Sequence, residues 1–299
     1  MTRTVTILGK ILGALVLSML ILGMGVYAYY NLPCDDRMRP VNLFVPEGAT
    51  LDQTAGLLEE KGVIRYHLIF SRMARVMGKD RSIRAGEYGL HSSMSPREVL
   101  QMLCRGEVVL HKVTVPEGFT VKQIATLLEK RGFSSREEIL AESRKVGFIE
   151  AFGFEGDSLE GYLFPDTYHF PMGLPPGEIL KAMVQRFRSV YGPGLRARQA
   201  ENRQTLHEVV TMASIVEKET GSRKEMPLIA SVMVNRLRVG MPLQCDPTVI
   251  YGIEDFDGNL TLEHLRTPNP YNTYLNKGLP PGPICNPGLD ALKAVLHPV

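Results

Sequence analysis

The sequence lacks most of the motifs that identify common enzyme classes. Its four cysteines are scattered, with no CxxC pair and none close to a histidine at metal-ligand spacing. It has no glycine-rich phosphate loop, no nucleophile elbow and no HExxH motif, and its seven histidines are isolated. A formal net charge of +2 provides no electrostatic case for nucleic-acid binding. We therefore expect no metal, no cofactor and no nucleic acid, which leaves carboxyl groups as the candidate catalysts.

Charged residues are also missing from one long segment near the N-terminus. Residues 11–30 are almost wholly apolar, about the ~20 residues that a helix needs to cross a bilayer core. A cleaved signal peptide is the alternative, but the apolar run is longer than usual and no small-residue cleavage site follows it. Arg3 and Lys10 precede the segment, and tyrosines lie at its far end. The pattern predicts a cytoplasmic tail (residues 1–10), one transmembrane helix, and the rest of the chain outside the cytoplasmic membrane.

An internal repeat follows the apolar segment. Residues 45–62 (VPEGATLDQTAGLLEEKG) align without a gap with residues 115–132 (VPEGFTVKQIATLLEKRG). In each copy a short strand leads through Pro-Glu-Gly to a helix that begins after Thr50 or Thr120 and ends at a glycine. We expect residues 41–133 to form a domain of βααβ units that resemble LysM-like glycan-binding modules. The alternative is that these units are spacers.

Residues 137–299 form the second predicted domain, of mixed α+β class. Helices are predicted at residues 179–191, 204–220, 226–237 and 286–296, the last of which Pro298 ends. Loops rich in proline and glycine lie between them, as is common in binding clefts. Among the cysteines, Cys245 and Cys285 either form a disulfide between two of these loops or remain free buried thiols.

The most informative segment is residues 211–221, TMASIVEKETG, with two glutamates at the end of an apolar helix. Helical spacing places Glu219 on the face of Met212, Ile215 and Val216, whereas Glu217 follows less apolar positions. Burial and the negative end of the helix dipole both raise the pKa of a carboxylic acid. Glu219 is therefore predicted to be the general acid, and Glu217 an orienting or merely solvated neighbour.

Two loop segments, QCDPTVIY (residues 244–251) and PYNTY (residues 270–274), are rich in tyrosine, asparagine, threonine and glutamine. Aromatic rings stack on sugar rings, and amides pair with hydroxyl groups, so these segments suit a sugar-binding cleft. The alternative is that Asp246 and Asn272 cap turns and that the tyrosines are core residues.

Several long motifs in this order resemble one known family. They are LEGYLFPDTY (residues 159–168), ASIVEKETG (213–221), VMVNRLRVGMPLQCDPTVIYG (232–252), and the stretch from PYNTY to NPG (270–288). With the N-terminal anchor, the chain resembles the membrane-anchored endolytic murein transglycosylases of the YceG-like family. The resemblance implies a lytic transglycosylase (a lyase) of the bacterial inner membrane, acting on peptidoglycan glycan strands beside the peptidoglycan synthases.

In that family one glutamate, the second in the EKE sequence, is the key catalytic residue, and its position here is Glu219. The resemblance implies that it cleaves the bond between N-acetylmuramic acid (MurNAc) and N-acetylglucosamine (GlcNAc) in nascent strands and leaves a 1,6-anhydro end. The expected substrate-binding residues are Glu217, Asn235, Gln244, Asp246, Thr248, Tyr251, Tyr271, Asn272 and Tyr274.

Two other functions stay open. One is a hydrolytic muramidase that uses Glu219 with Asp246, and the other is a non-catalytic scaffold that binds peptidoglycan. Family members usually continue beyond the position of Val299, so the resemblance also implies a catalytic domain truncated at its C-terminus.

Overall fold

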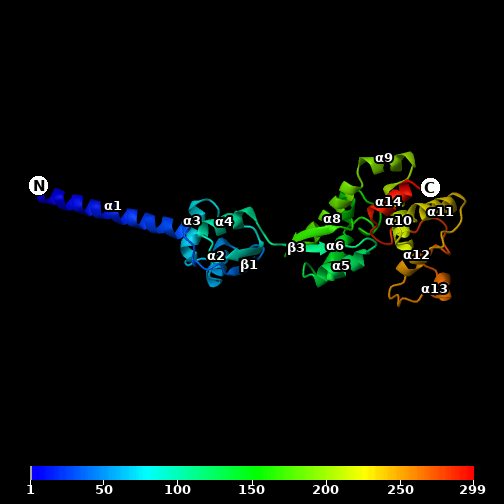
Figure 1. The fold of residues 1–299 in the computed structure, drawn as a ribbon, viewed down its shortest axis with the longest axis horizontal. Coiled ribbons are helices and arrows are strands. Elements are labelled where there is room, and N and C mark those ends of the chain that lie inside the picture. The colour runs from blue at the N-terminus through cyan, green and yellow to red at the C-terminus, as the bar shows by residue number, and fades with distance from the viewer. Residues whose placement is uncertain (1) are drawn as a thin grey trace. The chain divides into compact units, whose positions relative to one another are not determined.

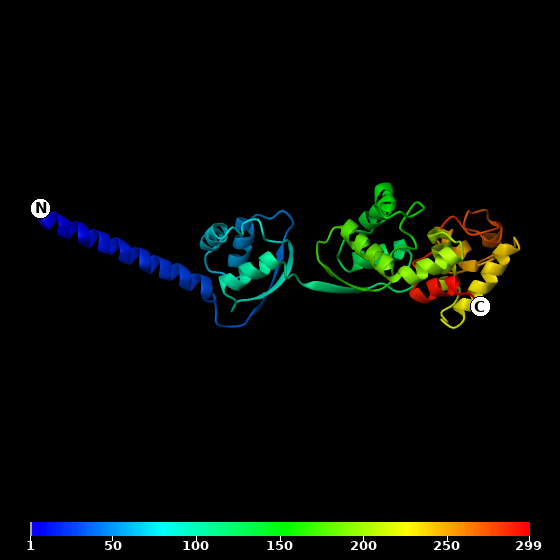
Figure 2. The same ribbon diagram turned by 90° about the horizontal axis from the view of Figure 1, so that it is seen from above.

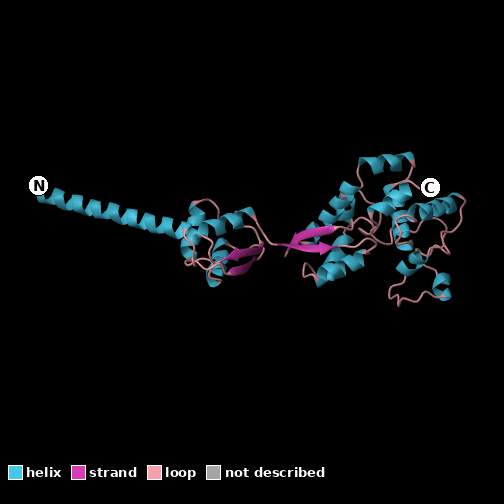
Figure 3. Ribbon diagram, viewed as in Figure 1, coloured by secondary structure: helices cyan, strands magenta, loops and turns pink. Residues whose placement is uncertain are grey.

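The computed structural model describes residues 2–299, with side chains from residue 10 onward, and forms two compact units. The first unit runs to His111 and includes Pro171–Gly173, and the second comprises Lys112–Phe170 and Leu174–Val299. Short strands and many helices occur in both (Figure 1, Figure 3), which confirms the predicted mixed α+β class. Met1 of the predicted cytoplasmic tail lies outside the described residues.

The elements of the first unit are α1 (Thr2–Asn31), β1 (Pro40–Val45), α2 (Leu51–Glu60), α3 (His67–Val76), β2 (Gly86–His91) and α4 (Pro96–Arg105). Those that follow are β3 (Leu110–Thr114), α5 (Val121–Lys130), α6 (Arg136–Ser143), α7 (Val146–Ala151), β4 (Thr167–Pro171), α8 (Pro176–Val190), α9 (Pro193–Glu201), α10 (Leu206–Glu219), α11 (Met226–Arg238), α12 (Asp246–Tyr251), α13 (Leu262–Arg266) and α14 (Leu289–Leu296).

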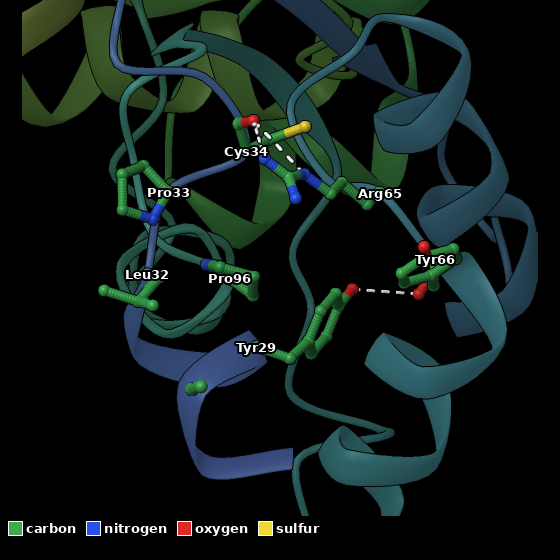
Figure 4. A pocket seen from close by; sticks show the side chains of 8 residues that line it. Tyr29, Leu32, Pro33, Cys34, Arg65, Tyr66 and Pro96 are labelled. Carbon is green, nitrogen blue, oxygen red and sulfur yellow. Dashed lines mark hydrogen bonds between the residues drawn. The ribbon is translucent and has the colours of Figure 1, made fainter. Parts of the chain in front are cut away.

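Helix α1 contains the predicted membrane span. Its segment Lys10–Asn31 has a mean hydropathy of 2.2 and is long and apolar enough to cross a membrane. None of its most apolar stretch is buried against the protein, as is expected of a helix whose apolar side chains contact lipid. Where α1 ends, the Tyr29 hydroxyl donates to the Tyr66 carbonyl oxygen at 2.9 Å, and the Arg65 guanidinium donates to the Cys34 carbonyl oxygen at 2.7 Å (Figure 4).

The first unit is built around one antiparallel pair of strands. Strands β1 and β2 pair from Pro40 opposite His91 to Val45 opposite Gly86. Because side chains alternate along a strand, Leu43 and Val45 point to the same side and are buried. Helices α2 and α4 bury their apolar faces in the same core. The βααβ order predicted for this unit is present, and its likeness to LysM modules stays a prediction.

The two repeat copies have the same local structure. Thr50 and Thr120 each accept a hydrogen bond from the backbone N–H of a glutamine three residues later, whose side chain in turn accepts from the threonine N–H. This capping box satisfies two amides at the start of α2 and of α5. The preceding Gly48 and Gly118 both have a φ of 76°, which favours glycine in the turn.

The second copy belongs to the second unit, so the chain divides earlier than the predicted domain end at residue 133. The Val115 N–H donates to the Asp166 carbonyl oxygen at 2.9 Å beyond the end of β3, which pairs with β4. The Asn286 N–H likewise donates to the Phe119 carbonyl oxygen at 2.9 Å. Local sequence similarity between the copies therefore does not decide which core each one joins.

The core of the second unit forms around α10, which contacts α11, α12 and α14. Figure 2 shows α14, in red, beside these yellow-green helices. The structure confirms the helices predicted near α8, α10, α11 and α14, with end shifts of a few residues. Five helices in the second unit had no sequence prediction: α6, α7, α9, α12 and α13.

Candidate active site

Helix α10 carries the two candidate glutamates out of the core. Its first turn is closed by a capping box between Thr205 and Glu208, which fixes where the helix starts. Residues 209–216 are all buried, so the middle of the helix is held on every side. After Glu219 the chain turns extended at Thr220 (φ −145°, ψ 143°). The last turn of α10 therefore brings polar side chains to the edge of the core in a fixed position.

Glu217 is used in the packing of two helices. Its Oε2 accepts a hydrogen bond of 2.9 Å from the backbone N–H of Gly288, the N-cap residue of α14. Burial raises the pKa of Glu217, and the charges of Glu117 and Asp290 raise it further, although the Gly288 N–H acts in the opposite direction. This carboxylate joins the end of α10 to the start of α14, so it is not merely solvated.

Glu219 is more exposed than Glu217, contrary to the prediction from helical spacing. The reason is that the start of α14 covers Glu217, whereas the chain leaves the core directly after Glu219. The pKa of Glu219 is nevertheless raised, first by partial burial and then by the negative charge of Asp246, while Arg236 lowers it. Among the residues that the structure describes, no hydrogen-bond donor is paired with the Glu219 carboxyl group, so it is free to exchange a proton.

Asp246 and Tyr274, two predicted site residues, lie together beside Glu219. The Tyr274 hydroxyl donates to Asp246 Oδ1 at 2.6 Å, and this bond raises the pKa of Tyr274 to about 12. Tyr274 therefore stays protonated and keeps Asp246 oriented. The structure thus brings Glu219, Asp246 and Tyr274 together from α10, α12 and the PYNTY loop.

The turn before Asp246 is strained and firmly held. Gln244 has a φ of 54°, in the left-handed region that non-glycine residues rarely adopt. Its N–H donates to the Thr273 carbonyl oxygen at 3.0 Å, and the Cys245 N–H donates to Thr273 Oγ1 at the same distance. Arg236 donates to the Leu243 carbonyl oxygen. These bonds fix the position from which Asp246 acts on Glu219.

Two of the predicted substrate-binding residues are fully buried. Asn272 donates to the Leu265 carbonyl oxygen at 3.1 Å, and its Oδ1 accepts from the Tyr274 N–H at 3.0 Å. Thr248 donates to the Cys245 carbonyl oxygen at 2.6 Å. Neither side chain reaches solvent, so in this structure both shape loops. Two other predicted residues, Asn235 and Gln244, are exposed.

Tyr251 and Tyr271 form a tilted pair, with ring centroids 4.8 Å apart, and Tyr251 leads to a carboxyl group that sequence reasoning missed. The Tyr251 hydroxyl donates to Glu160 Oε2 at 3.3 Å. Glu160 is only 6% exposed, and burial raises its pKa to about 8 in spite of the donors around it. The apolar surroundings of Glu160 in LEGYLFPDTY were the only signal that could have revealed it.

Both cysteines of the second unit are buried free thiols, which decides between the two alternatives. The Cys285 Sγ donates to the Ser214 carbonyl oxygen at 3.2 Å, in the middle of α10. Burial raises the pKa of the Cys245 thiol to about 12. Neither thiol is therefore an activated nucleophile.

Comparison with known proteins identifies the family. The model of the YceG-like family matches residues 43–299. The chain belongs to the YceG-like family. It is 32% identical over 279 residues to an endolytic murein transglycosylase from Bacillus subtilis, covering 88% of this chain and 77% of that one. An endolytic murein transglycosylase from Streptococcus pneumoniae serotype 2 is 30% identical over 298 residues, but this chain spans only 54% of it.

A solved structure supports the same placement. The crystal structure of a putative YceG-like protein from Listeria monocytogenes matches with a TM-score of 0.60 and 31% sequence identity, over 87% of this chain and 90% of that chain. The predicted family is thereby confirmed, and the names of the curated relatives support the predicted enzyme class, a lytic transglycosylase.

The site of this YceG-like chain suits proton transfer at a single carboxyl group. Glu219 has a raised pKa and no hydrogen-bond partner among the described residues, whereas Glu217 and Glu160 are held by hydrogen bonds to the protein. A carboxyl group with a raised pKa keeps its proton closer to neutral pH and can donate it to a leaving group. The other carboxyl groups position α14, α5 and Tyr251.

Proposed function

We propose that this chain is a membrane-anchored endolytic lytic transglycosylase and that Glu219 is its acid and base. The observation that carries the proposal is the Glu219 carboxyl group at the end of the buried helix α10, which has no hydrogen-bond partner among the described residues. Its pKa is raised by burial and by the charge of Asp246. Relatives named endolytic murein transglycosylase support the substrate class, which is peptidoglycan.

In the proposed mechanism, protonated Glu219 donates its proton to the oxygen between MurNAc and GlcNAc, and the bond from that oxygen to the muramyl C1 breaks. Glu219, now a carboxylate, then accepts the proton of the muramyl C6 hydroxyl as this oxygen bonds to C1. The products are a GlcNAc hydroxyl end and a 1,6-anhydro-MurNAc end. The reaction consumes no water and needs no second carboxylate as a nucleophile, so one free carboxyl group is sufficient.

We also propose that α1 anchors the enzyme in the inner membrane, with the N-terminus in the cytoplasm and the second unit outside. The apolar segment Lys10–Asn31 supports the anchor, and the basic residues before it support the orientation. In this position the enzyme meets nascent strands beside the synthases. Alkaline phosphatase, which needs disulfides that form only outside the cytoplasm, should be active when fused after Val299, whereas a fusion that is produced but inactive would overturn the orientation.

The mechanism is tested with Glu219→Gln, which removes the proton but keeps the shape. Purified sacculi digested with the unaltered protein should release products with anhydro ends, and Glu219→Gln should release none. The matched control is Glu263→Gln, on exposed α13, which should behave like the unaltered protein. An equal yield of anhydro ends from Glu219→Gln and from the unaltered protein would contradict the assignment of Glu219 as the catalytic residue.

A hydrolytic muramidase is the second candidate, because Asp246 lies close enough to raise the pKa of Glu219. Retaining hydrolysis uses such a pair of carboxyl groups and leaves reducing ends. Mass spectrometry of the same digests separates the two reactions, since an anhydro end is one water lighter than a reducing end. A digest with neither kind of new end would support a non-catalytic scaffold.

A further inference from the structure

The second unit contains a cavity of about 610 Å³ that the proposed reaction does not use. Its wall includes Lys218, which lies between the two glutamates at the end of α10, and Pro247, which directly follows Asp246. The cavity therefore lies on the same two helices, α10 and α12, that carry Glu219 and Asp246. Its volume falls within the ~300–1,000 Å³ typical of small-ligand sites.

Unpaired positive charge gathers on this wall. Lys122 at the start of α5, Arg144 after α6, and Lys218 all line the cavity and are exposed. Within the part of the chain that the structure describes, none of the three forms a salt bridge, whereas Lys145, the residue after Arg144, pairs with Glu142. Cations that the protein leaves unpaired beside a cavity favour an anionic ligand.

The buried acid on the wall does not cancel this charge. Glu160 accepts hydrogen bonds from the Val121 N–H at 3.1 Å, from Asn286 Nδ2 at 3.0 Å and from the Tyr251 hydroxyl. Since its pKa is about 8, Glu160 is mainly protonated at neutral pH. Glu254 is the one other acidic residue among the described lining residues, against three cations.

Apolar surface lies beside these charges. Ile250, Ile253 and Phe256 line the cavity between α12 and the loop that follows it, and the Tyr251 ring adds an aromatic face. A ligand that fits this wall combines anionic groups with short apolar groups.

We propose that this cavity is a subsite for the carboxylate-bearing peptide stem of the glycan strand. Stem peptides combine several carboxylates with short aliphatic side chains, and each is attached to a muramyl residue of the strand. A strand held with a muramyl C1 at Glu219 brings a stem to the neighbouring wall. This inference rests on the proposed function, because it assumes that peptidoglycan is the ligand.

The first experiment compares two substrates for the full-length protein in detergent: strands that retain their stems, and the same strands after an amidase has removed them. Stem-free strands keep the lactyl carboxylate, so only the peptide differs. The unaltered protein should form anhydro ends with a higher kcat/KM on stem-bearing strands. Equal kcat/KM on both substrates would overturn the subsite.

Variants of the wall assign the effect to the cations. Lys122→Ala and Arg144→Ala should each lower kcat/KM on stem-bearing strands about five-fold, the loss expected for one exposed charge pair, and leave stem-free strands unaffected. Lys122→Arg should retain most of the activity. The matched control is Lys130→Ala, at the exposed far end of the same helix. Equal losses on both substrates would show a structural defect and overturn the assignment.

Binding without turnover separates this inference from the proposed reaction. In the Glu219→Gln protein, calorimetry with a free stem tripeptide should detect binding that weakens with added salt and in Lys122→Ala. If Glu219→Gln still cleaves strands while the tripeptide binds, the catalytic assignment fails and the subsite stands. If the tripeptide does not bind while Glu219→Gln is inactive, the subsite fails and the catalytic assignment stands.

Discussion

The carboxyl groups of Asp246 and Glu219 lie close together at the end of α10. From this proximity we predict how the reaction rate depends on pH. The charge of Asp246 raises the pKa of Glu219, so Asp246→Asn should lower that pKa while burial continues to raise it. A general acid works only while it is protonated, so the alkaline limb of the rate profile should move to lower pH in Asp246→Asn. The measurement is the initial rate of anhydro-end formation against pH.

The control for this profile is Asp290→Asn. Asp290 raises the pKa of Glu217 but does not act on Glu219, so its removal should leave the alkaline limb in place. An unchanged limb in Asp246→Asn would contradict the electrostatic role. Loss of activity at every pH would instead support Asp246 as the nucleophile of a muramidase.

From the buried carboxyl group of Glu160 we predict that the stability of the fold, rather than the reaction rate, depends on pH. Its pKa is about 8 in the fold and ordinarily near 4.5, so between these values the folded state binds more protons than the unfolded state. Stability should therefore decline as the pH rises from about 5 to 8, by on the order of 1 kcal/mol per pH unit for this group. In Glu160→Gln the side-chain oxygen still accepts from Val121 and Asn286, and the charge is absent.

Urea unfolding of Glu160→Gln and of the unaltered protein at several pH values measures this dependence. The difference in unfolding free energy between the two proteins should shift in favour of Glu160→Gln as the pH rises. A constant difference across this range would mean that Glu160 is already ionised in the folded protein.

At the scale of helices, Glu217 should matter for stability through α14. Glu217→Ala removes the acceptor for the Gly288 N–H at the start of this helix, which should lower the free energy of unfolding by about 1–2 kcal/mol. Glu217→Gln keeps an oxygen in place and should lose less. Thermal unfolding of the second unit measures both, and equal destabilisation by the two variants would show that charge, not the hydrogen bond, holds α14.

Helix ends were predictable from the sequence where the signal is local. The helix starts after Thr50 and Thr120 were expected from the sequence, and in the structure each is closed by a capping box between residues three apart. Helices α12 and α13 were not predicted, since they have only six and five residues and lack an amphipathic period long enough to recognise.

Burial at the site was not predictable, because it depends on distant segments. Glu217 is covered by α14, some seventy residues later in the chain, as the bond from Gly288 shows. Glu160 receives its donors from Val121, Tyr251 and Asn286, which lie far apart in the sequence. The helical pattern therefore misjudged which glutamate is more buried, and the choice of Glu219 as the catalyst stays a prediction.

At the scale of the whole molecule, the repeat and the two units do not coincide. The first copy closes its sheet with β2 inside the first unit, whereas β3 of the second copy pairs with β4 in the second unit. Two copies of one motif thus contribute to two separate cores. Because each core is closed within its own unit, a change in one copy should affect only the unit to which that copy belongs.

Matched variants of the two repeat copies test this division. Thr50→Ala and Thr120→Ala each remove the same capping box, which is worth about 1 kcal/mol, from α2 in the first unit or from α5 in the second. Hydrogen exchange of the full chain in detergent, followed by peptide mass spectrometry, reads both units in one sample. Thr50→Ala should speed exchange at β1 and β2, and Thr120→Ala should speed it at β3, β4 and α14. If both variants speed exchange in the same set of peptides, the two copies share one cooperative unit and the division at His111 is wrong.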